Sequence, residues 1–259
     1  MKERLAIGLV QADLVWQAPA ENRALLGDLL AEGALGLDLA LLPETFTTGF
    51  TQAADAFAEP FEGPTLEWMA DQAARHQLTL AGSYLVEEGG RYFNRLVWMP
   101  PNGDYQTYDK RHLFSMAGEH EVFTAGNQRK VFECQGWRCC PMICYDLRFP
   151  VWSRSRQDYD LLFYVANWPE ARTRQWSRLL TARAIENQAF VAGVNCFGTD
   201  GEGYSYAGDS QIYDPLGEPM ADNEGGETLL RAELSAFQLA RLRDKFPVLE
   251  DADDFTLKL

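Results

Sequence analysis

The sequence predicts an α/β domain with mixed β-sheets. Short apolar runs that are typical of strands alternate with segments whose apolar residues recur at helical spacing. Several strands are joined by turn-forming residues and not by helices, so antiparallel as well as parallel pairs should occur. No change of composition, repeat or low-complexity stretch divides the 259 residues. We therefore expect residues 1–259 to form one domain.

The first half contains two strand–helix alternations followed by a hairpin. The run at residues 37–42 is apolar throughout, as in a strand buried on both faces. The helix at 21–33 ends in a glycine, and the helix at 65–76 follows a proline. Glu-Glu-Gly-Gly and Pro-Pro-Asn-Gly mark the turns of the hairpin region. The expected strands are residues 5–11, 37–42, 78–86, 92–99 and 105–108.

The second half repeats this alternation. Its strongest helix pattern covers residues 175–187, and a second helix is expected at 237–245. The turn at 214–217 lies between the last two strands, which we expect to pair with each other. The expected strands are residues 137–144, 160–167, 190–195, 208–213 and 228–234.

Composition and charge exclude several classes of protein. Apolar residues make up 46% of the chain, which is enough to build a core and argues against disorder. The 38 acidic residues outnumber the 23 basic ones, giving a net charge of −15. This excess disfavours nucleic acid and anionic membranes as partners, because both are bound through Lys and Arg. No membrane span is apparent, and the apolar run at 5–10 is short for a secretion signal, so a cytoplasmic location is expected.

Cysteine and histidine usage predicts neither a disulfide framework nor a metal site. The five cysteines are an odd number in a long chain. The three histidines and the absence of a Cys-x2-Cys pair give no zinc pattern. We expect no metal and no other cofactor.

Three polar segments that follow apolar strands contain residues suited to acyl transfer. Glu44 follows a buried strand and could move protons. Lys110 could neutralise an anion that develops on a substrate. Cys144 lies at a strand-to-turn elbow, where backbone N–H groups could lower its pKa and the N–H of Tyr145 could bind an oxyanion. Each residue taken alone also has a non-functional interpretation: Glu44 as a solvated carboxylate, Lys110 as a solvated lysine and Cys144 as an inert thiol.

Taken together, the three segments resemble the carbon–nitrogen hydrolase (nitrilase) superfamily, whose signature is this Glu–Lys–Cys set. The similarity extends over essentially the whole chain, and within the superfamily the chain most resembles the omega-amidase branch. It implies a four-layer α-β-β-α sandwich, a homodimer and no cofactor. The blocks that carry it are residues 43–44, 108–114, 144–150, 164–169, 183–187 and 208–217.

The resemblance also implies a catalytic role for each residue of the set. Cys144 would attack an amide carbon to form a thioester, Glu44 would transfer protons, and Lys110 with the Tyr145 N–H would hold the oxyanion. A second glutamate should orient Lys110 or the substrate; we predict Glu119, with Glu121 as the alternative. We expect structural roles for four further residues, with Arg148 pairing with an acid: Asp146, Arg148, Glu186 and Asn187.

The expected substrates are small 2-oxo dicarboxylic acid monoamides, 2-oxoglutaramate and 2-oxosuccinamate. Arg172 and Arg174 are candidates to bind the distal carboxylate, and Phe46 and Trp168 are candidate pocket walls. Solvated loop charge is the alternative for both arginines. The alternative activity is hydrolysis of deaminated glutathione or of another small linear amide. Two other classes stay open, a non-catalytic interaction module and a thiol redox sensor based on Cys144.

Overall fold

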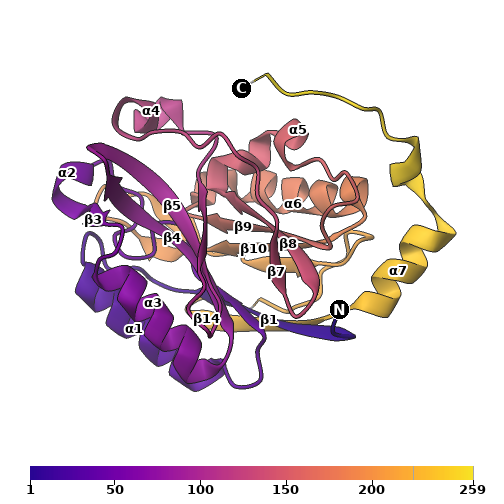
Figure 1. The fold of residues 1–259 in the computed structure, drawn as a ribbon. Coiled ribbons are helices and arrows are strands. Elements are labelled where there is room, and N and C mark those ends of the chain that lie inside the picture. The colour runs from indigo at the N-terminus through magenta and orange to yellow at the C-terminus, as the bar shows by residue number, and fades with distance from the viewer. Residues whose placement is uncertain (224, 259) are drawn as a thin grey trace.

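Two β-sheets pack face to face at the centre of the computed structural model, which describes residues 1–223 and 225–258 (Figure 1). The strands of the first sheet are β1 (Arg4–Gln11), β2 (Leu39–Leu41), β3 (Glu59–Pro60), β4 (Thr79–Glu88), β5 (Arg91–Met99), β6 (Gln106–Asp109) and β14 (Thr228–Ser235). Their order is β14-β1-β2-β4-β5-β6, with β3 beside β4. The β1, β2 and β4 pairings are parallel, whereas β4–β5, β5–β6 and β1–β14 are antiparallel, so this sheet is mixed.

The second sheet is also mixed. It contains β7 (Phe132–Cys134), β8 (Trp137–Ile143), β9 (Leu161–Ala166), β10 (Phe190–Asn195) and β13 (Gln211–Tyr213). Its order is β13-β10-β9-β8-β7, in which β8, β9 and β10 are parallel. A separate hairpin is formed by β11 (Phe197–Thr199) and β12 (Ser205–Ala207).

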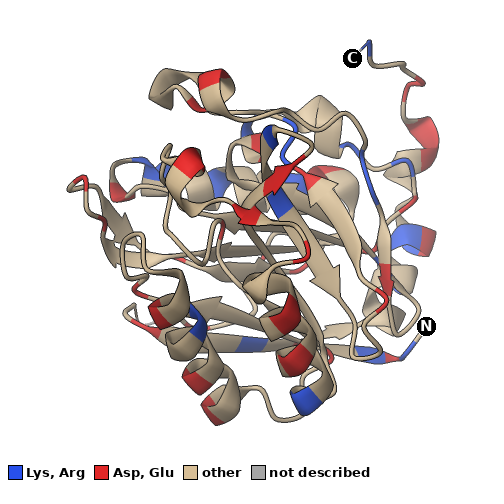
Figure 2. Ribbon diagram, turned by 60° about the vertical axis from the view of Figure 1, so that its left-hand side comes forward, with Lys and Arg blue, Asp and Glu red and all other residues tan. Residues whose placement is uncertain are grey.

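Helices cover the outer faces of both sheets. Helices α1 (Pro19–Gly33) and α3 (Pro64–His76) lie on the first sheet, and α5 (Pro150–Ser153) and α6 (Thr173–Asn187) lie on the second (Figure 1). Acidic residues are frequent on α1 and α3, where they face solvent (Figure 2). The chain is therefore the four-layer α-β-β-α sandwich that the sequence resemblance implied.

Strand alternation divides the core between the layers. Leu5, Ile7 and Leu9 of β1 are fully buried among residues of the second sheet. Val10 lies on the opposite face, where it packs with residues of α1 and α3. In the outer layer of the second sheet, α6 approaches β10 closely: a Cβ added to Gly193 would lie 2.6 Å from Leu180 Cδ1.

The remaining helical segments are short except for α7 (Ala236–Lys245) near the C-terminus. They are α2 (Ala54–Phe57), α4 (Glu119–Val122) and the 3-10 segments Ser115–Ala117, Cys144–Arg148, Glu170–Arg172 and Val248–Asp251. Within the described part of the chain, no helix is long and apolar enough to cross a membrane.

One predicted pairing is wrong. The strands expected at 208–213 and 228–234 do not pair with each other: β13 joins β10 in the second sheet, whereas β14 runs antiparallel to β1 along its whole length. The turn after β13 closes locally through a bridge between Tyr213 and Pro219. The chain then crosses to the other sheet, because β1 offers a full-length edge with which β14 can pair.

Candidate active site

Four strand ends place polar residues at one edge of the two sheets. Glu44 follows β2, Lys110 follows β6, Cys144 follows β8 and Asn167 follows β9. Strands β8 and β9 are parallel, with Ile143 opposite Val165, so their next residues emerge close together. The thiol of Cys144 lies 3.9 Å from the carbonyl oxygen of Asn167.

Cys144 lies on a strained elbow. Its φ is +41°, in the left-handed region that side chains rarely adopt. The 3-10 segment Cys144–Arg148 begins at this residue. The backbone N–H of Tyr145 belongs to the first turn of this segment, where N–H groups lack an intrahelical acceptor.

Behind the elbow, the buried Asp146 fixes the backbone. Its carboxylate accepts hydrogen bonds from the Tyr108 hydroxyl at 2.7 Å, from His112 N at 2.9 Å and from Ile143 N at 3.0 Å. Asp146 therefore has the structural role that we predicted.

Lys110 is held between two buried carboxylates. Its Nζ lies 2.8 Å from Glu44 Oε1 and 2.9 Å from each oxygen of Glu119. All three side chains are at most 1% exposed. Glu121, the alternative for the second glutamate, is exposed to solvent. The structure thus places Glu119, and not Glu121, against Lys110.

Backbone and amide groups orient Glu44. Its Oε2 accepts the Asn167 N–H at 2.9 Å, and its Oε1 accepts the Asn94 side chain at 2.9 Å. The side-chain amide of Asn167 donates to the backbone carbonyl oxygen of Glu44 at 2.8 Å. Asn167 therefore links the two catalytic candidates: its backbone N–H binds the Glu44 carboxylate, and its carbonyl oxygen lies next to the Cys144 thiol.

The surroundings set the ionisation of Lys110 and Cys144. Burial alone would lower the pKa of Lys110, but the charges of Glu119 and Glu44 outweigh it and raise this pKa, so the amine stays protonated. Burial and the charge of Glu44 raise the pKa of the Cys144 thiol well above its ordinary value, against the opposing effect of Lys110. The expected lowering of the Cys144 pKa is therefore wrong, and the thiol needs a base before it can attack.

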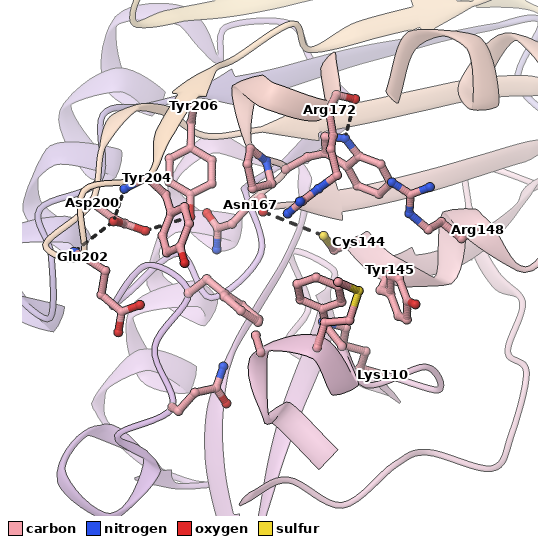
Figure 3. A pocket seen from close by; sticks show the side chains of 17 residues that line it. Lys110, Cys144, Tyr145, Arg148, Asn167, Arg172, Asp200, Glu202, Tyr204 and Tyr206 are labelled. Carbon is pink, nitrogen blue, oxygen red and sulfur yellow. Dashed lines mark hydrogen bonds between the residues drawn. The ribbon is translucent and has the colours of Figure 1, made fainter. Parts of the chain in front are cut away.

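A cavity of about 760 Å³ opens over this cluster. Arg148, Arg172, Cys144 and Tyr145 lie on one side of it, and Asp200, Glu202, Tyr204 and Tyr206 of the β11–β12 hairpin lie on the opposite side (Figure 3). Trp168 also lines the cavity. The remaining lining residues are Phe50, Gln52, Lys110, Phe114, Met116, Ala117, Asn167 and Pro169.

Two predicted pocket residues lie in the wall and two do not. Trp168 and Arg172 line the cavity. Phe46 is fully buried against Trp68 and Tyr84, with ring centroids 5.7 and 6.2 Å away, in the core between the first sheet and helices α1 and α3. Arg174 does not line this cavity; it lies with Arg178 in a neighbouring hollow at the start of α6, whose lining also includes Arg148. These two placements contradict our predictions for Phe46 and Arg174.

The sequence analysis also missed residues of the wall. Arg148 was expected to pair with an acid, but its guanidinium lies 4.8 Å from the centroid of the Trp168 ring and borders the cavity. Phe50, and not Phe46, lines the cavity, and the centroid of its ring lies 5.2 Å from Lys110 Nζ. The tyrosines of the β11–β12 hairpin had no recognisable signal in the sequence.

This four-layer sandwich, with a cysteine and a lysine in the wall of one cavity and two buried glutamates against the lysine, defines a nitrilase-like α/β protein. The carbon-nitrogen hydrolase family model matches residues 6–244. The chain belongs to this family, and it is a hydrolase of carbon–nitrogen bonds other than peptide bonds.

Individual relatives are similar over nearly the full length. An omega-amidase YafV of Yersinia enterocolitica is 48% identical over 255 residues, covering 98% of each chain. A 2-oxoglutaramate amidase of Bacillus subtilis is 34% identical, covering 95% of this chain and 96% of the relative. A solved carbon–nitrogen hydrolase superfamily protein of Xanthomonas campestris, with an arsenic adduct in its active site, superposes with a TM-score of 0.96 at 46% identity, covering 98% of this chain and 99% of that protein.

Proposed function

We propose that the protein is an omega-amidase, which hydrolyses the distal amide of 2-oxoglutaramate and 2-oxosuccinamate to the acid and ammonia. The observation that carries this choice of substrate is the pair Arg148 and Arg172 in the cavity wall. The Arg148 guanidinium lies over the Trp168 ring, and the Arg172 guanidinium lies over the Phe114 ring. In the described residues neither guanidinium has a carboxylate partner. An unpaired arginine in a cavity is suited to bind a substrate carboxylate. The full-length identity to proteins named omega-amidase supports the same choice.

The reaction follows from the arrangement of the cluster. Glu44 takes the proton of the Cys144 thiol as the sulfur attacks the amide carbon, and it passes that proton to the departing ammonia. The tetrahedral oxyanion is held by Lys110 and by the Tyr145 N–H. Water, activated by Glu44, then adds to the thioester and releases the acid and the free thiol. Glu119 keeps Lys110 charged and in place throughout.

The wider setting is proposed on separate grounds. We infer that residues 1–259 work as one domain, since residues of both sheets share one buried cluster. A homodimer through the outer α5–α6 layer is supported by Val151, Ile185 and Leu216, which are 50%, 52% and 61% exposed. Five cysteines without disulfides fit the reducing cytoplasm.

Ammonia release from a small panel of amides tests the proposed function. The wild-type protein should act on 2-oxoglutaramate and 2-oxosuccinamate, and Cys144→Ala should release no ammonia. Arg172→Leu should raise KM for these anionic amides while leaving a neutral amide of similar size unaffected. Arg174→Leu is the matched control, because Arg174 lies outside the cavity. A preference for deaminated glutathione would overturn the choice of substrate.

A further inference from the structure

Asn94 of β5 contacts both carboxylates of the cluster. Its Nδ2 lies 2.9 Å from Glu44 Oε1 and 3.5 Å from Glu119 Oε1. These are two of the oxygens that also accept hydrogen bonds from Lys110. The backbone carbonyl of Asn94 accepts the backbone N–H of Lys110 at 3.0 Å, so a single residue contacts both carboxylates and the main chain of the lysine between them.

The side-chain amide of Asn94 forms hydrogen bonds through its nitrogen and not through its oxygen. The side chain is 2% exposed, and its Oδ1 has no hydrogen-bond partner within the described residues. A flipped amide would direct this oxygen at two carboxylates, which repel it. The amide nitrogen of Asn94 therefore faces the two carboxylates, while its buried oxygen stays unpaired, which costs free energy.

The charge of the cluster explains why a neutral donor is needed there. Two carboxylates share one ammonium group, and burial prevents water from solvating the excess negative charge. A hydrogen bond to a carboxylate favours its charged form without adding a cation that would compete for the thiol proton. The titratable groups that face Glu44 are Lys110, Glu119, Cys144, Cys196 and Tyr206.

We propose that Asn94 is a positioning residue for catalysis, whose side-chain amide holds Glu44 in the orientation and charge state that proton transfer from Cys144 requires. Asn94 does not line the cavity, so it acts through Glu44 and not on the substrate. This inference rests on the proposed function, since it assigns a role within that reaction.

The test is the pH dependence of ammonia release by Asn94→Asp. This variant keeps the shape of the side chain but replaces the donor by a third carboxyl group. The acid limb of kcat/KM should move to higher pH, and kcat at pH 7 should fall about tenfold or more, with KM within about threefold of wild type. Asn94→Ala, which removes the donor without adding charge, should shift the limb in the same direction and serves if Asn94→Asp does not fold.

Asn187→Asp is the matched control. Asn187 is also fully buried, but its amide donates to Arg183 O and accepts from Ser155 N, at the C-terminal end of α6. The control can lose thermal stability, but its acid limb should stay where it is in the wild type. An unchanged acid limb in folded Asn94→Asp or Asn94→Ala overturns the inference while leaving the proposed function intact. If the wild-type protein releases ammonia from none of the amides, the proposed function itself is wrong.

Discussion

Replacing Glu44 by glutamine should slow amide hydrolysis and, at the same time, speed alkylation of the Cys144 thiol. Amide hydrolysis should fall by about 10²- to 10⁴-fold, because the group that transfers the proton is lost. The resting thiol should instead become more reactive toward iodoacetamide. The charge of Glu44 raises the pKa of Cys144, and removing it lets the opposing charge of Lys110 act with less competition.

The size of the second effect can be worked from the charges. A unit charge at roughly 5 Å, in a medium with an effective dielectric constant of about 20, contributes about 3 kcal/mol, or roughly two pKa units. Below the thiol pKa, a fall of two units raises the thiolate fraction about 100-fold. Because the more basic thiolate is the better nucleophile, the net gain in alkylation rate is smaller, about tenfold.

Mass spectrometry of the intact protein after timed alkylation at pH 7.5 measures this rate. Cys144 is the only partly exposed cysteine in the described residues, since Cys134, Cys139, Cys140 and Cys196 are at most 4% exposed. Cys144→Ala should therefore take up no label in the native state.

Glu121→Gln is the matched control for charge, because Glu121 is exposed and has no contact with Lys110. It should leave both hydrolysis and alkylation at wild-type rates. Alkylation of Glu44→Gln at or below the wild-type rate would refute the view that the Glu44 carboxylate keeps the thiol protonated.

Three further substitutions test the support of the site. Glu119→Gln should lower kcat about 10²-fold by weakening the hold on the lysine, which steady-state kinetics measures directly. Gly193→Ala should lower the free energy of unfolding by about 1–3 kcal/mol in denaturant titration, because its Cβ would lie 2.6 Å from Leu180. Tyr108→Phe should cost about 1–3 kcal/mol in the same assay by removing a donor from the buried Asp146, and an unchanged midpoint would argue against that hydrogen bond.

The sequence predicted the chemistry of the cluster better than its surroundings. Glu44, Lys110 and Cys144 each follow an apolar strand, and strand ends of stacked sheets can meet at one edge. Glu119 was preferred to Glu121, but spacing alone could not establish which of the two is buried. The residues that complete the cavity depend on long-range packing, which the sequence does not show. Arg148 packs on the ring of Trp168, and Phe46 packs in the core against Trp68.

The error at the last two strands has the same origin. A turn motif indicates where the chain reverses, but the choice between two sheet edges depends on contacts made more than 200 residues away, as in the pairing of β14 with β1. The ionisation of Cys144 was misjudged for a similar reason. Local backbone donors favour a thiolate, whereas burial and a carboxylate from a distant strand outweigh them in the folded chain.

The left-handed backbone of Cys144 has a consequence for the evolution of this chain. A residue with a side chain in that conformation costs about 1–2 kcal/mol relative to glycine. Selection for a robust fold would favour glycine at position 144, whereas selection for turnover requires sulfur. The backbone strain at this position is therefore retained for the thiol, because glycine, which would relieve it, carries no nucleophile.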